Sequence, residues 1–122
     1  MTGAAPPPKE FHHYGLRALE RPEAADFVPL TRVWVTDPRH HPQRIEYLCY
    51  EPDSFLAEEF KNAPHVAYKV AELGPHIAGK DIVLLFEVGD PPFAKVAFTR
   101  EDGIVYEYLE FKPGRTWFTE ES

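Results

Sequence analysis

Alternation of apolar and polar residues dominates the pattern along this chain, and it predicts strands far more often than helices. β-branched and aromatic residues fill the alternating segments, as is typical of strands. Short helices or helical turns are favoured only at 21–27, 54–62 and 72–79, and Asp102-Gly103 predicts a hairpin turn. The strands are expected at residues 11–18, 30–36, 44–51, 64–70, 81–88, 94–99 and 104–111.

Histidine and glutamate recur in these strands in the same order twice. His13 lies in the first strand and Glu46 in the strand at 44–51, and then His65 and Glu107 repeat the arrangement. This weak internal repeat predicts an α+β fold of two β-α-β-β-β units. The first unit is abbreviated, because the segment after its first strand is too short for a full helix.

Side chains alternate between the two faces of a strand, so each of these four residues defines a face. The opposite faces are apolar and aromatic and suit packing against helices. We therefore expect a curved mixed sheet that closes the ionisable faces around a pocket. Three other residues on the ionisable faces are candidates for substrate binding: Arg17, Lys69 and Tyr50.

Two imidazoles and two carboxylates are suitable ligands for a borderline divalent metal. Without a metal, two buried carboxylates would repel each other and would be costly to desolvate. Taken singly, each residue is more often a packing or solvated side chain, and the hypothesis depends on the joint pattern. Arg17 and Lys69 could bind a carboxylate or phosphate of a substrate, or could instead pair with nearby acidic residues.

Four segments around these residues resemble the vicinal oxygen chelate superfamily, which includes glyoxalase I, extradiol dioxygenases and antibiotic-resistance proteins. PHVAYKVAEL (64–73) resembles the family's histidine-bearing strand, and KVAFTREDGIVYEYLEF (95–111) resembles its closing hairpin. FHHYGL (11–16) is similar to the opening strand, and RIEYLCYEP (44–52) to the closing strand of the first unit. On this resemblance the ligand is His13, with His12 on the other face.

The resemblance implies a divalent metal (nickel, zinc, cobalt, manganese or iron) on His13, Glu46, His65 and Glu107. It implies a metal-dependent lyase or isomerase of glyoxalase type that acts on a small oxygen-chelating substrate, with Glu46 or Glu107 as general base. A homodimer is also expected from the family. Two alternatives stay open: a non-catalytic small-molecule binding protein of antibiotic-resistance type, and an Fe(II) extradiol dioxygenase that uses His13, His65 and Glu107. The extra carboxylate of Glu46 argues against the dioxygenase.

Composition and charge narrow the possible partners. The net charge is -7, and 13 basic residues are scattered among 20 acidic ones, which argues against nucleic acid and anionic membranes as partners. Cys49 is the only cysteine, so an intramolecular disulfide and a cysteine-rich zinc site are excluded. The N-terminus has no apolar core typical of a signal peptide, and we expect a cytoplasmic protein. The expected organisation is a disordered tail (1–9), one domain (10–118) and a frayed end (119–122).

Overall fold

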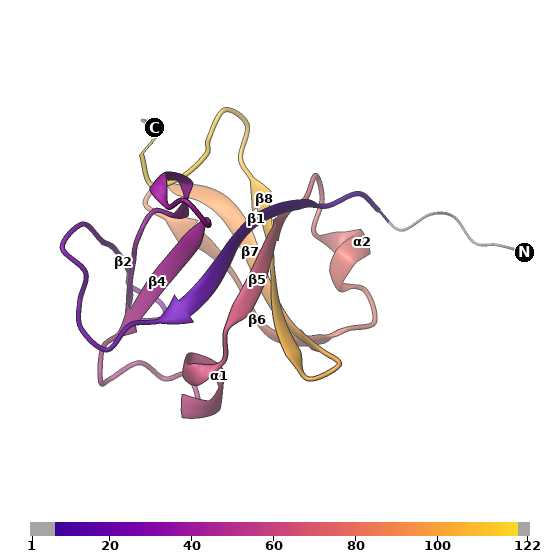
Figure 1. The fold of residues 1–122 in the computed structure, drawn as a ribbon. Coiled ribbons are helices and arrows are strands. Elements are labelled where there is room, and N and C mark those ends of the chain that lie inside the picture. Colours follow the sequence, from indigo (N-terminus) through magenta and orange to yellow (C-terminus); the bar gives the residue numbers. More distant parts are fainter. Residues whose placement is uncertain (1–6, 120–122) are drawn as a thin grey trace, which may run out of the picture.

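A computed structural model describes residues 7–119 of the chain (Figure 1). The expected tail at 1–9 and frayed end at 119–122 lie mostly outside this range. Within it, no helix is long and apolar enough to cross a membrane. Most of the regular structure is one curved, nearly closed, mixed sheet. Its strands are β1 (Glu10–Arg17), β2 (Asp26–Val28), β3 (Val33–Val35), β4 (Ile45–Tyr50), β5 (His65–Lys69), β6 (Asp81–Gly89), β7 (Pro92–Glu101) and β8 (Ile104–Phe111).

The two halves of the sheet have the same strand order about its centre. The full order is β2-β3-β4-β1-β5-β8-β7-β6. β1 and β5 are antiparallel neighbours at the centre, and each has a parallel partner on its other side, β4 and β8 respectively. The remaining neighbours pair antiparallel. The four central strands therefore bring together segments far apart in the sequence.

Helical structure is limited to short segments among the described residues. These are α1 (Glu58–Asn62), α2 (Gly74–Ile77) and a 3-10 turn, η1 (Pro38–His40). The expectations of a helical turn within 54–62 and a short helix within 72–79 are confirmed. The helical turn expected at 21–27 is wrong, because the chain there leads into β2, which pairs with β3 at the sheet edge. Strand pairing and burial of Val28 outweigh a weak local helix preference.

Helices cover the outer face of the sheet unevenly. Near α2 the ring of Tyr108 is almost fully buried and stacks on His76, with the ring centroids 5.4 Å apart. On β1, in the other half of the sheet, Tyr14 is 49% exposed on the same outer face. The expected packing of the outer face against helices is therefore present in the second half, and no described helix covers Tyr14 in the first.

The main hydrophobic core lies on the inner face of the curved sheet. Strands of both halves contribute to it, as does the segment after β8 through the buried Trp117 and the partly buried Phe118. Lys112 donates a backbone hydrogen bond to the Phe93 carbonyl at 2.8 Å, which fixes the start of this segment against β7. The inner face of the sheet is thus closed by its own C-terminal segment at one end.

Candidate metal centre

The four sequence-predicted ligands lie on the four central strands, one on each strand. Across the sheet they form two rows, each with a small residue in the middle. His13, Ala67 and Glu107 are register partners in one row. In the other row Glu46, Gly15 and His65 are register partners. Because a small residue stands between the two larger ones in each row, the four side chains can lean toward a common point.

Their donor atoms do converge. The Nε2 atom of His13 lies 3.1 Å from Oε1 of Glu107 and 3.3 Å from Oε1 of Glu46. The Nε2 atom of His65 lies 3.0 Å from Oε1 of Glu107 and 3.8 Å from Oε1 of Glu46. One ligand atom from each residue lies within 4.8 Å of all the others. All four residues are buried, and His13 has no exposed surface at all.

Three of these atoms have no hydrogen-bond partner although they lie so close together. They are Nε2 of His13, Nε2 of His65 and Oε1 of Glu107. Buried polar atoms in folded proteins are almost always satisfied, and leaving one unsatisfied costs about 1–3 kcal/mol. Because these three atoms lie close together without hydrogen-bonding to one another, they could all coordinate one cation placed between them. The donor set also suits the chemistry of such a cation, since imidazole and carboxylate bind borderline divalent metals.

Without a cation the close approach of these groups shifts the pKa values of His13 and Glu107 in opposite directions. Burial alone would lower the pKa of His13, but the carboxylates of Glu46 and Glu107 raise it to about 10. Burial would likewise raise the pKa of Glu107, but the imidazoles of His13 and His65 hold it below its ordinary value. A proton on His13 thus occupies the position that a metal ion would take, and the two compete.

Gly15 makes room for the His65 ring. These two residues are register partners on β1 and β5, and a Cβ built on Gly15 would overlap the imidazole. Any larger residue at this position would push the His65 ring away from the cluster. Gly15 belonged to the sequence motif of the first strand, but the reason for a glycine there becomes visible only in the packed sheet.

The prediction that His12 lies on the other face from His13 is wrong. A register irregularity between Phe11 and His13 interrupts the alternation of β1, and both histidines are buried. The Nδ1 atoms of the two rings lie 2.7 Å apart, so one must donate a hydrogen bond and the other accept it. If His13 binds a metal through Nε2, its Nδ1 carries the proton and His12 is the acceptor.

The surroundings of His12 suit the acceptor role. Its ring stacks on Trp117, with centroids 5.6 Å apart, and packs at 5.5 Å from Phe111. Burial first, and then the neighbouring His13 and Arg44, lower the pKa of His12 to about 3. His12 is therefore neutral at physiological pH and has an unprotonated nitrogen to offer. No spacing rule could have found this contact, because it depends on the irregularity in β1.

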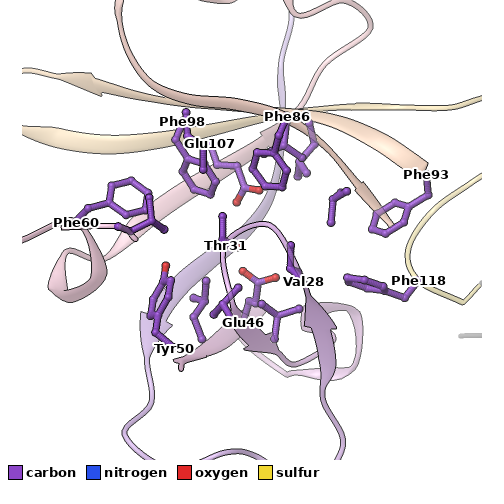
Figure 2. Close-up of a pocket in the computed structure, with 18 of the residues that line it drawn as sticks. Val28, Thr31, Glu46, Tyr50, Phe60, Phe86, Phe93, Phe98, Glu107 and Phe118 are labelled. Atoms are coloured by element: carbon purple, nitrogen blue, oxygen red, sulfur yellow. The ribbon is translucent and has the colours of Figure 1, made fainter. Parts of the chain in front are cut away.

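A cavity of about 50 Å³ adjoins the cluster on the concave side of the sheet. Figure 2 shows the carboxylates of Glu46 and Glu107 entering it from opposite walls. Neither His13 nor His65 lines it, so the imidazoles lie behind the carboxylates. A molecule in this cavity would meet the carboxylate side of the cluster first.

The three predicted substrate-binding residues are not brought together. Tyr50 lines the cavity, and its hydroxyl points inward in Figure 2. Arg17 donates hydrogen bonds to Glu58 at 3.1 Å and Asn62 at 2.7 Å and does not line the cavity. Lys69 is exposed at the end of β5 and lies in a separate shallow hollow. Most of the lining consists instead of aliphatic and aromatic residues that the sequence analysis did not select.

Comparison with known proteins identifies a similar fold but no family. No family profile matches the sequence, and no curated protein matches it. The structure is similar to that of a hypothetical protein from Bacillus halodurans, with 17% sequence identity and a TM-score of 0.63. The similarity covers 88% of this chain and 98% of that one. The chain therefore shares a known fold, and its curved sheet with a buried group of histidines and glutamates is compatible with a vicinal oxygen chelate fold.

Proposed function

We propose that this protein is a metal-dependent enzyme of the vicinal oxygen chelate type, a lyase or isomerase that acts on a small oxygen-chelating substrate. The observation that carries the proposal is the convergence of three buried, unpartnered donor atoms on one point beside a cavity. Matching strand orders in the two halves of the sheet support it as well. In this proposal each half is one β-α-β-β-β unit, and the first has lost its helix.

His13, Glu46, His65 and Glu107 would hold the metal. When bound, the metal would act as a Lewis acid toward neighbouring oxygens of the substrate. His13 and His65 lie behind the carboxylates and would anchor it from the closed side of the site. Nickel, zinc, cobalt, manganese and iron(II) all accept this mixture of nitrogen and oxygen ligands.

The two glutamates differ in how firmly they are held. Oε1 of Glu107 lies within 3.1 Å of both imidazoles, whereas Oε1 of Glu46 lies 3.3 Å and 3.8 Å from them. The looser Glu46 is the better candidate for a general base that moves a proton to or from the substrate. Burial, and then the charges of Glu46 and Glu107, raise the pKa of Tyr50, so its hydroxyl keeps its proton and can donate a hydrogen bond to the substrate.

A carboxylate from Glu46 in the cluster weighs against the extradiol dioxygenase alternative, which needs only two histidines and one glutamate. The homodimer remains part of the proposal. The exposed ring of Tyr14, on the side of the sheet where no described helix covers it, supports this part.

Metal content of the purified protein tests the proposal. We expect about one divalent metal ion per chain after reconstitution at neutral pH, measured by elemental analysis and by competition with a chelator. His65→Ala should weaken the binding at least about 100-fold, because loss of a supporting residue alone costs 10–100-fold. His40→Ala is the matched control, since this exposed histidine pairs with Asp37 outside the cluster. Failure of the wild-type protein to retain any of the five metals would refute the proposal.

A further inference from the structure

The cavity beside Glu46 and Glu107 has a mainly apolar lining. Apart from the two carboxylates, the hydroxyls of Thr31 and Tyr50 and the indole N–H of Trp117, its lining is apolar. Strands β6 and β7 contribute Leu84, Phe86 and Phe98 to the lining, and the C-terminal segment adds Trp117 and Phe118. Phe86, Phe98 and Phe118 are labelled in Figure 2. Such a lining favours the burial of hydrocarbon and gives almost no compensation for the desolvation of a charge.

Positive charge is absent from the lining, as far as the structure describes the chain. Two basic residues beside the cavity, Arg17 and Lys61, lie within 6.0 Å of the Tyr50 ring and have their partners elsewhere. Arg17 bonds to Glu58 and Asn62, while Lys61 pairs with Glu58 at 3.3 Å and donates to the Ser54 carbonyl. A negatively charged substituent in the cavity would lose its hydration without any basic side chain of the lining to pair with, since the charge of a bound metal is already shared with Glu46 and Glu107.

We propose that the substrate joins an oxygen-chelating end to a short, uncharged aliphatic arm, and that the arm occupies this cavity. This inference rests on the proposed function, because the chelating end must reach the metal at Glu46 and Glu107. The cavity of about 50 Å³ limits the arm to a few carbon atoms, since each water-sized group needs roughly 10–15 Å³. Substrates with a carboxylate or phosphate on the arm are excluded by the same walls.

Three hydroxamates that share one chelating end test the nature of the arm. Acetohydroxamate carries a methyl group, butyrohydroxamate carries a propyl group, and succinic acid monohydroxamate replaces the terminal methyl of the latter with a carboxylate. Calorimetry on the metal-loaded protein should show butyrohydroxamate binding roughly tenfold more tightly than acetohydroxamate, from two more buried methylene groups. The succinic compound should bind at least tenfold more weakly than butyrohydroxamate.

A charge placed in the wall should reverse this preference. Leu84 and Leu85 are neighbours on the edge strand β6, but only Leu84 lines the cavity, and Leu85 is 55% exposed. In Leu84→Lys the succinic compound should bind at least tenfold more tightly than it does to the wild-type protein. Leu85→Lys carries the same charge on the other face and should leave all three affinities unchanged.

The possible outcomes separate this inference from the proposed function. Equal affinities for the three hydroxamates, or tightest binding of the succinic compound to the wild-type protein, overturn the apolar arm while leaving the metal site intact. If the protein binds a metal but none of the three compounds, both the proposed function on a chelating substrate and the proposed substrate class are refuted. An identical response of Leu84→Lys and Leu85→Lys also overturns the inference, because it places the arm outside the cavity.

Discussion

Replacing Gly15 with alanine adds a single methyl group at the point where β1 passes His65. The added Cβ would overlap Cε1, Nε2 and Nδ1 of the His65 imidazole. The backbone of Gly15 is held on both sides by β4 and β5, so the imidazole is the part that must move. Once displaced, His65 can no longer place Nε2 beside Glu107, and the proposed metal centre loses one of its four ligands.

The size of the effect follows from two contributions. Overpacking a well-packed interior costs about 1–3 kcal/mol, which lowers Tm of the metal-free protein by roughly 4–12 °C for a domain of this size. In addition, loss of a ligand should weaken metal binding at least about 100-fold. At a metal concentration 100 times the wild-type Kd, bound metal stabilises the wild-type protein by about 2.7 kcal/mol, or roughly 10 °C. The same concentration should stabilise Gly15→Ala by only about 0.4 kcal/mol.

Thermal unfolding with and without metal separates the two contributions, because Tm of the metal-free protein reports the packing and the rise in Tm on adding metal reports mainly the metal affinity. Gly74→Ala is the matched control: an alanine at the start of α2 meets no atom within 4 Å and should keep the full metal-induced shift. A Gly15→Ala protein that keeps the wild-type shift would show that His65 is not a ligand, or that the sheet yields where we expect it to be rigid.

Two further predictions concern residues that support the site and the fold. His12→Phe should weaken metal binding roughly 10–100-fold in a chelator competition assay. His12→Asn should recover most of the affinity, because its side chain can keep an acceptor near Nδ1 of His13. Equal affinities of the two variants would contradict the acceptor role. Glu101 accepts hydrogen bonds from Thr99 at 2.6 Å and Tyr108 at 2.8 Å and pairs with Lys80. Burial alone would raise the pKa of Glu101, but these three partners hold it below the ordinary 4.5. Because the folded-state pKa is the lower one, the stabilisation is complete above about pH 4.5 and is lost as the pH falls through the folded-state value. Glu101→Gln should therefore cost about 1 kcal/mol in urea unfolding at pH 7 and progressively less as the pH falls below 4.5. A deficit that does not change with pH would refute this assignment.

Alternation along the chain was sufficient to locate most of the strands. Seven of the eight observed strands coincide with predicted segments, because a strand with one buried face repeats its apolar residues every second position. The hairpin between β7 and β8 was equally readable, since Asp102 and Gly103 both adopt a positive φ in its turn. β2 was missed because its three residues have too little pattern of their own, and pairing with β3 makes them a strand.

The proposed ligands were also readable one by one, as a histidine or glutamate on the ionisable face of a strand. That they meet was expected from the repeat and the resemblance, but the geometry of the cluster was not readable. It depends on the order β4-β1-β5-β8 and on the register that aligns Glu46 with His65 and His13 with Glu107. Local alternation also failed at His12, where the irregular register of β1 turns both adjacent histidines inward.

The sequence by itself determined seven of the eight strands and, except at His12, which of their faces carry chemistry, because both follow from the two-residue period of an extended chain. Only the tertiary structure decided that Arg17 and Lys69 lie away from the cavity and that aromatic residues from β6, β7 and the C-terminal segment enclose it. These features arise from the curvature of the sheet and from contacts between distant segments, and no local pattern records either of them.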